Sequence, residues 1–322
     1  MSLYVSKTLI LLPFLRIGMV ISGILPNFAS KTSIVMILNE NYTLANGVQI
    51  PKLGLGTWMI PDAETAEAVR QAVAMGYHHI DTAQAYQNER GVGEGVRTCG
   101  TDRSNLFITT KIAAEHKTYA AAAASIDESI QKMGLDYCDL MIIHAPQPWA
   151  EFRGVKRYFE ENREVWRALE DAYEAGKVRA IGVSNFLIDD LQNLLDTCRI
   201  RPMVNQILLH IGETPTDLVA FCRANQIQLE AYSPIAHGAA LKSEGVAQIA
   251  AKYAVGIAQL CIKYTLQLGA VSLPKSSNPD HIRSNARLDF TISDEDMLLL
   301  ESIGQDYGAD SRFPVFSKKK QL

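Results

Sequence analysis

The sequence lacks the signals that mark several classes of protein. Its five cysteines are scattered and form no CxxC pair, which argues against a zinc site or a disulfide framework and fits a reducing cytosol. Positive charge is not in excess, because the 322 residues carry a formal net charge of −4. Composition therefore offers no case for nucleic-acid binding, and the short basic run 318–320 is expected to be solvated.

The sequence also lacks an uninterrupted apolar stretch long enough to cross a membrane as a helix. The best candidate, Leu9–Leu25, is broken by Pro13 and Arg16, and it has no clear signal-peptide cleavage site. We expect residues 1–35 to be an N-terminal extension outside the folded domain, with a targeting or anchoring segment as the alternative. Residues 36–322 should form a single domain, because no change of composition marks a linker.

Short apolar stretches alternate with helical periodicity through most of the chain. A hairpin around Asn46–Gly47 comes first, and eight short strands that are apolar on both faces follow. This pattern favours a closed parallel (β/α)₈ barrel with the hairpin at its N-terminal end, although an open doubly wound sheet stays possible. The predicted strands are 53–58, 77–80, 106–110, 140–143, 180–183, 203–206, 227–231 and 271–273. The predicted helices are 63–75, 89–98, 120–133, 163–175, 188–198, 217–224, 257–268, one opened by Pro279, and an extra C-terminal helix over 292–303.

No glycine-rich dinucleotide motif follows a strand. The run Gly91–Gly95 resembles such a motif superficially, but it lies inside a helical stretch. We therefore interpret these glycines as a site of close helix packing.

The stretch Gly76–Glu89, GYHHIDTAQAYQNE, combines a strand that ends in Asp81 with a polar loop that carries Tyr86. A phenol is a weak acid at neutral pH unless a cation lies beside it, and a buried cation needs an anion. Lys111 ends the third strand, where an unpaired ammonium would be costly to bury. We predict that Asp81 holds Lys111 and that Lys111 makes Tyr86 a better proton donor. His144, at the end of the fourth strand, should orient a carbonyl oxygen.

An acid aimed at a carbonyl oxygen needs a hydride donor, which must be a nicotinamide cofactor because no side chain donates hydride. Ser184, Asn185 and Gln206 offer groups that suit a carboxamide. Tyr232 offers a flat ring, and Lys275–Asn278 precedes a helix as a candidate phosphate cradle. The complete set of predicted cofactor contacts is Thr57, Ser184, Asn185, Gln206, Tyr232, Ser233, Pro234, Lys275, Ser276, Ser277, Asn278 and Arg283.

Each of these residues also has a structural interpretation when it is taken alone. His144 can be a core histidine and Tyr232 a packing residue, and only their joint occurrence at successive strand ends favours function. Two rivals stay open: a Schiff-base lyase that uses Lys111, and a non-catalytic cofactor-binding sensor or subunit. We predict no metal site, because the other histidines lack ligand spacing; they are His78, His79, His116, His210 and His237.

From about Tyr42 to Phe313 the chain resembles the aldo-keto reductase superfamily. The matching motifs, in family order, are LGLGTW, HIDTAQAYQNE, TTKI, MIIHAP, GKVRAIGVSNF, VNQ, AYSP and LPKSSNPDHIRSN. The resemblance implies an NADPH-dependent reductase of aldehydes and ketones on a TIM barrel, with NADH as a possible second cofactor. It also implies a monomer in the cytoplasm, a small-molecule carbonyl substrate, and neither a nucleic-acid nor a membrane partner.

The resemblance also assigns roles to individual residues. The catalytic tetrad of the family falls on Asp81, Tyr86, Lys111 and His144. The nicotinamide contacts fall on Ser184, Asn185, Gln206 and Tyr232, and the adenosine-phosphate contacts on Lys275, Ser276, Ser277 and Asn278. The implied substrate pocket contains Trp58, His144 and Trp149.

The chain departs from the family pattern at two places. His281 and Ser284 stand where an arginine and a glutamate usually contact the adenine end, and Arg283 lies well round the helix, so NADPH preference should be weakened. Ala145 replaces an aromatic residue after His144, and the loop that follows is short. That short loop resembles those of bacterial members of the 2,5-diketo-D-gluconate reductase type, and it implies an open pocket for 2-oxoaldehydes, diketo acids or aromatic aldehydes.

Overall fold

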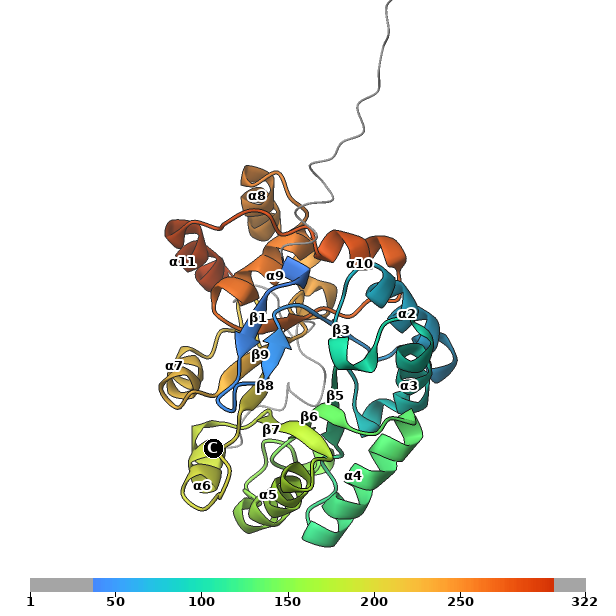
Figure 1. Cartoon of the computed structure of the whole chain (residues 1–322). Coiled ribbons are helices and arrows are strands. Elements are labelled where there is room, and N and C mark those ends of the chain that lie inside the picture. The colour runs from blue at the N-terminus through green and yellow to red at the C-terminus, as the bar shows by residue number, and fades with distance from the viewer. Residues whose placement is uncertain (1–36, 304–322) are drawn as a thin grey trace, which may run out of the picture.

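The structure, a computed structural model, describes residues 37–303, so the predicted extension 1–35 and the tail after Ile303 lie outside the described residues. Eight parallel strands form one sheet whose order follows the chain from β3 to β10 (Figure 1). The first and last strands meet, because Gly56 N donates to Pro274 O at 3.1 Å and Ser272 N donates to Lys52 O at 2.9 Å. This closure confirms the predicted barrel and excludes the open doubly wound sheet.

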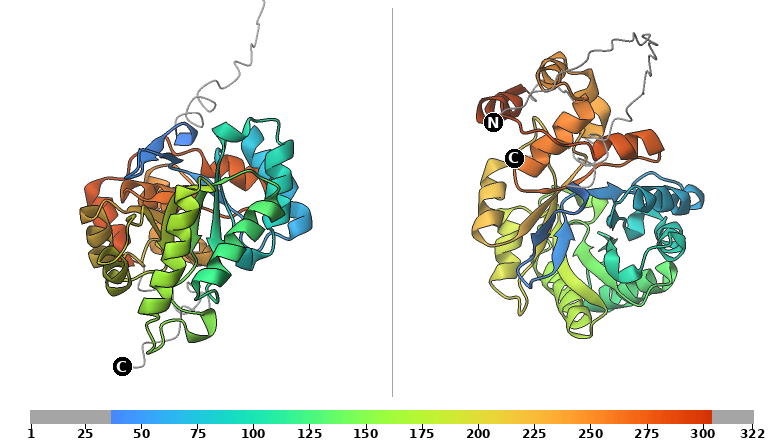
Figure 2. Two further views of the ribbon diagram at one scale, coloured as in Figure 1. Left: turned by 60° about the horizontal axis from the view of Figure 1, so that its bottom comes forward. Right: turned by 45° about the horizontal axis from the view of Figure 1, so that its top comes forward.

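The helices form an outer layer around the barrel (Figure 2). The barrel strands are β3 (Gly54–Gly56), β4 (His79–Asp81), β5 (Phe107–Ile112), β6 (Cys138–Ile143), β7 (Val178–Ser184), β8 (Val204–Leu208), β9 (Gln228–Tyr232) and β10 (Val271–Leu273). The described helices are α2 (Asp62–Ala74), α3 (Glu89–Thr98), α4 (Tyr119–Met133), α5 (Phe159–Glu174), α6 (Ile188–Leu195), α7 (Thr216–Ala224), α8 (Glu244–Lys252), α9 (Ile257–Gln267), α10 (Pro279–Asn285) and α11 (Asp294–Ile303). Every residue of β5 and β6 is buried, as expected of strands that face a packed interior on one side and helices on the other.

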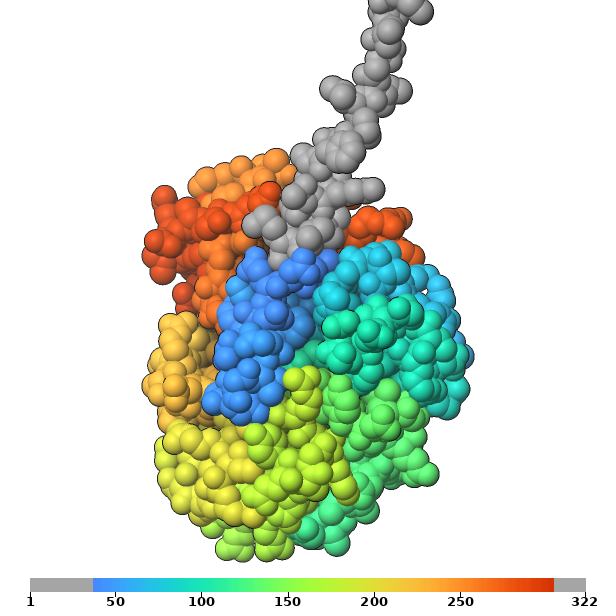
Figure 3. All heavy atoms as spheres, viewed as in Figure 1, coloured from blue at the N-terminus to red at the C-terminus, as the bar shows by residue number. Residues whose placement is uncertain are grey.

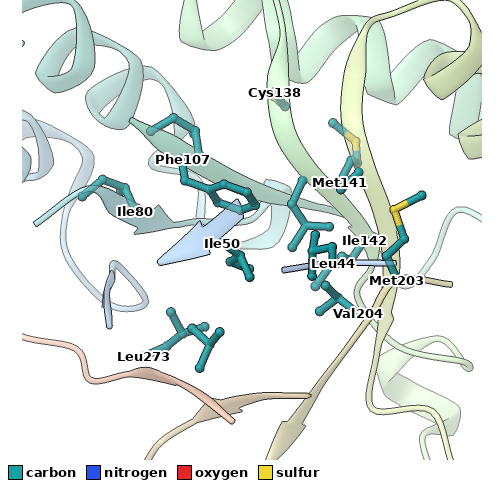
Figure 4. Close-up of a cluster of buried hydrophobic side chains, with 14 of the residues drawn as sticks. Leu44, Ile50, Ile80, Phe107, Cys138, Met141, Ile142, Met203, Val204 and Leu273 are labelled. Carbon is teal, nitrogen blue, oxygen red and sulfur yellow. The ribbon is translucent and has the colours of Figure 1, made fainter. Parts of the chain in front are cut away.

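The predicted hairpin forms and closes the N-terminal end of the barrel. Its strands are β1 (Asn41–Thr43) and β2 (Gln49–Pro51), and Gly47 supplies the left-handed turn with φ of +86°. In the space-filling view the hairpin, in blue, lies across the middle of this face (Figure 3). Leu44 and Ile50 point inward and lie in one apolar cluster with barrel residues (Figure 4). Functional groups are therefore left to the opposite end, where the strands finish.

The structure corrects several predicted boundaries and adds one helix. The strand with Lys111 continues to Ile112, α5 begins at Phe159, and the last helix begins at Asp294. The added helix is α8, which has only nine residues and follows the irregular run Ala236–Lys242. Its capping residue, Ser243, accepts a hydrogen bond from Val246 N, a signal that sequence reasoning missed.

Within residues 37–303 we find no single helix with the length and apolar character of a membrane span. The α8 and α9 helices satisfy the length and composition criteria only as a pair, and they meet at a bend of 81°. The α9 helix packs against β10 and so belongs to the outer layer of the barrel.

The glycines of α3 serve helix packing, as predicted. A Cβ atom at Gly93 would overlap the backbone carbonyl of Met133 at the end of α4. A Cβ atom at Gly95 would lie 2.6 Å from Val69 Cβ on α2. The small residues therefore let three helices approach one another closely.

The substitution Gly93→Ala should therefore destabilise the fold by about 3 kcal/mol, because its methyl group meets backbone that cannot move without repacking. Thermal or urea unfolding measures this loss. The matched control is Gly245→Ala on α8, where the new methyl group meets only the Ile303 side chain at 3.3 Å. The control should be neutral or gain up to about 1 kcal/mol from helix propensity. Equal effects at the two positions would contradict the packing role.

Candidate active site

A buried ion pair forms the base of the site at the carboxyl ends of β4 and β5. Lys111 Nζ lies 2.7 Å and 2.8 Å from the two carboxylate oxygens of Asp81 and 2.8 Å from Thr82 O. Lys111 is fully buried, and the Asp81 side chain is 5% exposed. The three ammonium hydrogens thus all have acceptors, and the two opposite charges cancel in the interior.

Tyr86 lies directly above this pair. It ends the one-turn 3₁₀ helix Gln84–Tyr86, and its ring centroid is 4.8 Å from Lys111 Nζ. Within residues 37–303 the structure gives the Tyr86 hydroxyl no hydrogen-bond partner. Its proton is therefore free to be donated to a bound molecule.

The electrostatic environment of Tyr86 differs from the sequence-based expectation. Burial, and then the negative charge of Asp81, raise the pKa of Tyr86 well above its ordinary value of 10.0. The expected lowering by Lys111 is not found, because burial outweighs the effect of the ammonium and Asp81, which lies against it, adds a negative charge. Tyr86 consequently keeps its proton at neutral pH, which is the form that an acid needs.

His144 follows β6 and faces the same space as Tyr86. Its ring lies 5.6 Å from the Tyr86 ring and 5.0 Å from the Trp149 ring, and both contacts are edge-on. Burial, and then the Lys111 charge, lower the pKa of His144 well below 6.5, so the imidazole is neutral. A neutral imidazole can donate one hydrogen bond to an oxygen without adding charge. Trp58, the third predicted pocket residue, contacts the His237 ring at 5.5 Å.

The residues predicted to bind the nicotinamide form one cluster next to His144. Ser184 Oγ donates to Gln206 O at 2.8 Å, and Asn185 Nδ2 donates to Ser184 Oγ and to His144 O, both at 3.0 Å. Tyr232 completes the cluster, because its hydroxyl donates to Asn185 Oδ1 at 2.7 Å. The cluster offers neutral amide and hydroxyl groups and a partly exposed ring. Because these hydrogens are already donated within the protein, the side-chain oxygens are left as acceptors, which suits the NH₂ group of a neutral carboxamide.

Gln206 links this cluster to the ion pair. Its Nε2 donates one hydrogen to Asp81 Oδ2 at 2.9 Å and the other to Glu230 Oε2 at 3.0 Å. Both amide hydrogens are thus used inside the protein, so the amide oxygen is the group left for a ligand. Glu230 was not singled out from the sequence, because a single acid in an apolar strand has no local signature.

The predicted phosphate-binding residues lie beyond β10. Lys275 and Ser277 are exposed, while Asn278 caps α10 by accepting from Asp280 N at 2.8 Å. Arg283 pairs with Asp280 at 3.1 Å, so its guanidinium is already engaged. The Lys275 ammonium has no ion-pair partner among residues 37–303, and together with hydroxyls and backbone N–H groups it suits a phosphate.

The remaining predicted contacts occupy different surroundings. Thr57 is fully buried, and its hydroxyl donates to Asp81 O at 2.9 Å, so it lies behind the site. Ser233 lies 3.3 Å from His237 Nε2, and Pro234 is buried beside it. Over residues 37–303 no three His, Cys, Asp or Glu side chains gather as metal ligands.

Two residues that sequence reasoning missed hold the Tyr86 loop in place. Gln84 donates to Ser125 O at 2.9 Å and to Ser129 Oγ at 2.8 Å, which fixes the loop to α4. Asn88 donates to Thr57 O at 2.9 Å and accepts from Thr82 Oγ1 at 2.7 Å. The only local signal was the amide side chains in QAYQN, which are too common in loops to be assigned a role.

The sequence is also similar to those of known proteins. A family model described as the aldo/keto reductase family matches residues 52–305. The 9,11-endoperoxide prostaglandin H2 reductase of Trypanosoma cruzi is 41% identical over 277 residues, which cover 84% of this chain and 94% of that protein. The glyoxal reductase of Bacillus subtilis is 40% identical over 271 residues, with the same coverage of 84% and 94%.

A solved structure also matches. The crystal structure of a Bombyx mori aldo-keto reductase in complex with NADP superposes with a TM-score of 0.74 and 30% identity. The match covers 82% of this chain and 92% of that one. The similarity thus extends over almost the whole described barrel.

Proposed function

Because this chain belongs to the aldo/keto reductase family, we propose that it reduces aldehydes and ketones to alcohols with Tyr86 as the proton donor. Members of this family are NAD(P)H-dependent oxidoreductases that act on carbonyl groups, and this chain is one of them, with NADPH as its cofactor. One observation carries the assignment of Tyr86. Its unpartnered, protonated hydroxyl lies above the buried Asp81–Lys111 pair and beside the neutral ring of His144.

We propose the following division of work among the residues. The reduced nicotinamide, when bound, supplies the hydride that joins the carbonyl carbon. The carbonyl oxygen, held by the hydroxyl of Tyr86 and the imidazole of His144, gains negative charge and takes the Tyr86 proton. The phenolate that remains is stabilised by Lys111, which Asp81 holds in place.

The amide cluster would bind the cofactor in this proposal. Ser184, Asn185 and the Gln206 amide oxygen would hold the carboxamide, and the Tyr232 ring would pack against the nicotinamide. Lys275 and the Ser276–Asn278 turn would bind the phosphate that distinguishes NADPH from NADH.

The contacts of Lys111 argue against the Schiff-base lyase. An amine must be unprotonated and accessible to attack a carbonyl carbon. Lys111 is fully buried, and its nitrogen makes three hydrogen bonds, two of them to a carboxylate. Borohydride should therefore trap no substrate on this residue.

For the substrate we propose small 2-oxoaldehydes and aromatic aldehydes. One support is the 40% identity to a glyoxal reductase. Another is the small side chain of Ala145, which packs in one apolar cluster with the half-buried ring of Trp149. Rates of NADPH oxidation with glyoxal, methylglyoxal, phenylglyoxal and a bulky ketone test this choice. Faster turnover of the bulky ketone would contradict it, and cofactor binding without any turnover would favour the sensor alternative.

We expect NADPH to bind more tightly than NADH by about tenfold, since Lys275 remains to contact the 2′-phosphate but the family arginine is His281 here. Fluorescence quenching of the tryptophans during titration with each cofactor measures both dissociation constants. His281→Arg should raise the preference for NADPH by a further factor of about three to ten. Arg283→Met is the control and should change little, because Arg283 already pairs with Asp280. Equal affinities for the two cofactors in the wild-type protein would contradict the role of Lys275.

We also propose that residues 36–322 act as one domain and that the protein is a monomer in the cytoplasm. The family match over residues 52–305 supports a single unit. Light scattering after size exclusion would test the oligomeric state.

A further inference from the structure

A second carboxyl group is buried beneath the site. Glu230 lies in the middle of β9 and is fully buried. Its Oε2 accepts a hydrogen from Gln206 Nε2 at 3.0 Å, while the other hydrogen of the same nitrogen goes to Asp81 Oδ2 at 2.9 Å. One amide therefore connects the Glu230 carboxyl group directly to the carboxylate that holds Lys111.

The rest of the Glu230 environment is poor in donors. Its Oε1 has no hydrogen-bond partner within residues 37–303, and it lies 3.7 Å from His79 Nε2. That nitrogen is already engaged with Thr109 Oγ1 at 3.0 Å. Burial lowers the pKa of His79 to about 3, so its ring is neutral and cannot serve as a counter-ion.

The groups that face Glu230 come from four strands. The ionisable ones are Asp81 and His79 from β4 and Lys111 from β5. The residues in register on the neighbouring strands β8 and β10 are Gln206 and Val271, and neither carries a charge. One amide hydrogen bond is little compensation for a buried negative charge, so the neutral carboxylic acid is favoured.

We propose that Glu230 is a positioning residue whose carboxyl group must stay protonated for carbonyl reduction, because an additional buried negative charge would oppose the charge that forms on the substrate oxygen. With Glu230 neutral, the opposite charges of Asp81 and Lys111 cancel. With Glu230 ionised, the cluster carries a net negative charge below Tyr86, just where the reaction builds negative charge above it. This inference rests on the proposed reductase function.

The pKa of Glu230 differs from those of Tyr86 and His144, so its effect on activity can be recognised. Burial, and then the nearby Asp81 carboxylate, raise the pKa of Glu230 from 4.5 to about 8. Tyr86 keeps its proton far above that pH, and His144 is neutral far below it. A fall in reductase activity near pH 8 would therefore belong to Glu230 rather than to either of these groups.

Glu230→Gln is the decisive variant, because the amide imitates the protonated acid at every pH. We expect wild-type kcat/KM for an aldehyde, at saturating NADPH, to fall about threefold to tenfold between about pH 7 and about pH 9.5. The variant should change less than about twofold over the same range. Glu230→Met is a second neutral variant that lacks the acceptor for Gln206. It should be slower at all pH values but share the flat profile.

Thermal unfolding at several pH values detects the proton on Glu230 independently of catalysis. The unfolded chain releases it near pH 4.5 and the folded chain near pH 8, so wild-type stability should fall as pH rises between those values. The difference in Tm between Glu230→Gln and the wild type should grow as pH rises from about 4.5 to about 8.

Glu89→Gln is the matched control for the activity profile. Glu89 is also buried, but its carboxyl group accepts a hydrogen bond from Thr110 Oγ1, and Asp81 and Lys111 do not contribute to its pKa shift. The shape of its activity profile should match the wild type.

Three other results would overturn the inference. Parallel activity profiles of the wild type and Glu230→Gln, with no pH-dependent difference in Tm, would show that Glu230 holds no proton at neutral pH. Parallel activity profiles with a difference in Tm would show that the proton is held but does not act on the site. Absence of carbonyl reduction by the wild type at every pH, with the difference in Tm intact, would refute the proposed function and this role of Glu230 with it.

Discussion

Replacing Tyr86 by phenylalanine should lower kcat/KM for aldehyde reduction by about a thousandfold and leave NADPH binding almost unchanged. The Tyr86 phenol, whose ring lies next to Lys111, carries a protonated hydroxyl that can be donated to a substrate. Within the described residues that hydroxyl makes no hydrogen bond, so its removal leaves no partner unsatisfied and should cost little stability. Steady-state kinetics and a fluorescence titration with NADPH measure the two quantities separately.

Tyr77→Phe is the matched control for this variant. It removes another phenol hydroxyl from the same stretch of sequence, one that donates to Ile282 O at 2.9 Å in the core. Loss of this buried hydrogen bond should cost about 1 kcal/mol of stability and leave kcat/KM within about twofold of the wild type. Retention of most reductase activity by Tyr86→Phe would refute the role of Tyr86 as proton donor.

Replacing Lys111 by methionine should abolish reduction and also destabilise the protein by about 3 to 5 kcal/mol. The methionine side chain fills a similar volume, but the Asp81 carboxylate is left buried without its counter-ion. The phenolate that forms at Tyr86 also loses the cation beneath it. Chemical unfolding and single-turnover reduction report the two losses independently.

A double variant separates the structural role of the pair from its chemical role. In Lys111→Met with Asp81→Asn no uncompensated charge remains, so much of the lost stability should return. Activity should stay absent, because no cation faces Tyr86. Recovery of activity in the double variant would show that the ammonium is not needed and would contradict the account.

The positions of the ionisable residues could be predicted from the sequence because they depend on local patterns. Asp81, Lys111 and His144 each end an apolar run, and in a closed parallel barrel all strand ends meet on one face. The hairpin turn at Asn46–Gly47 and the packing glycines of α3 were predictable for the same reason.

The electrostatics of the site could not be predicted, because they depend on contacts between distant parts of the chain. The pattern showed that Lys111 needs an anion, but not that burial, together with the Asp81 charge, would leave the pKa of Tyr86 raised rather than lowered. The loop anchor Gln84 contacts residues more than forty positions away, which no local pattern encodes. Glu230 likewise looked like one polar residue in a strand until Gln206 connected it to Asp81.

The most direct test of the whole account follows the hydride itself. The purified protein is given NADPH that carries deuterium at the transferring position, together with phenylglyoxal, and the alcohol is analysed by mass spectrometry and NMR. The account predicts one deuterium on the carbon that bears the new hydroxyl for each NADPH consumed, and loss of this product in Tyr86→Phe. An alcohol without deuterium, or turnover of the carbonyl compound without consumption of NADPH, would contradict direct hydride transfer at this site.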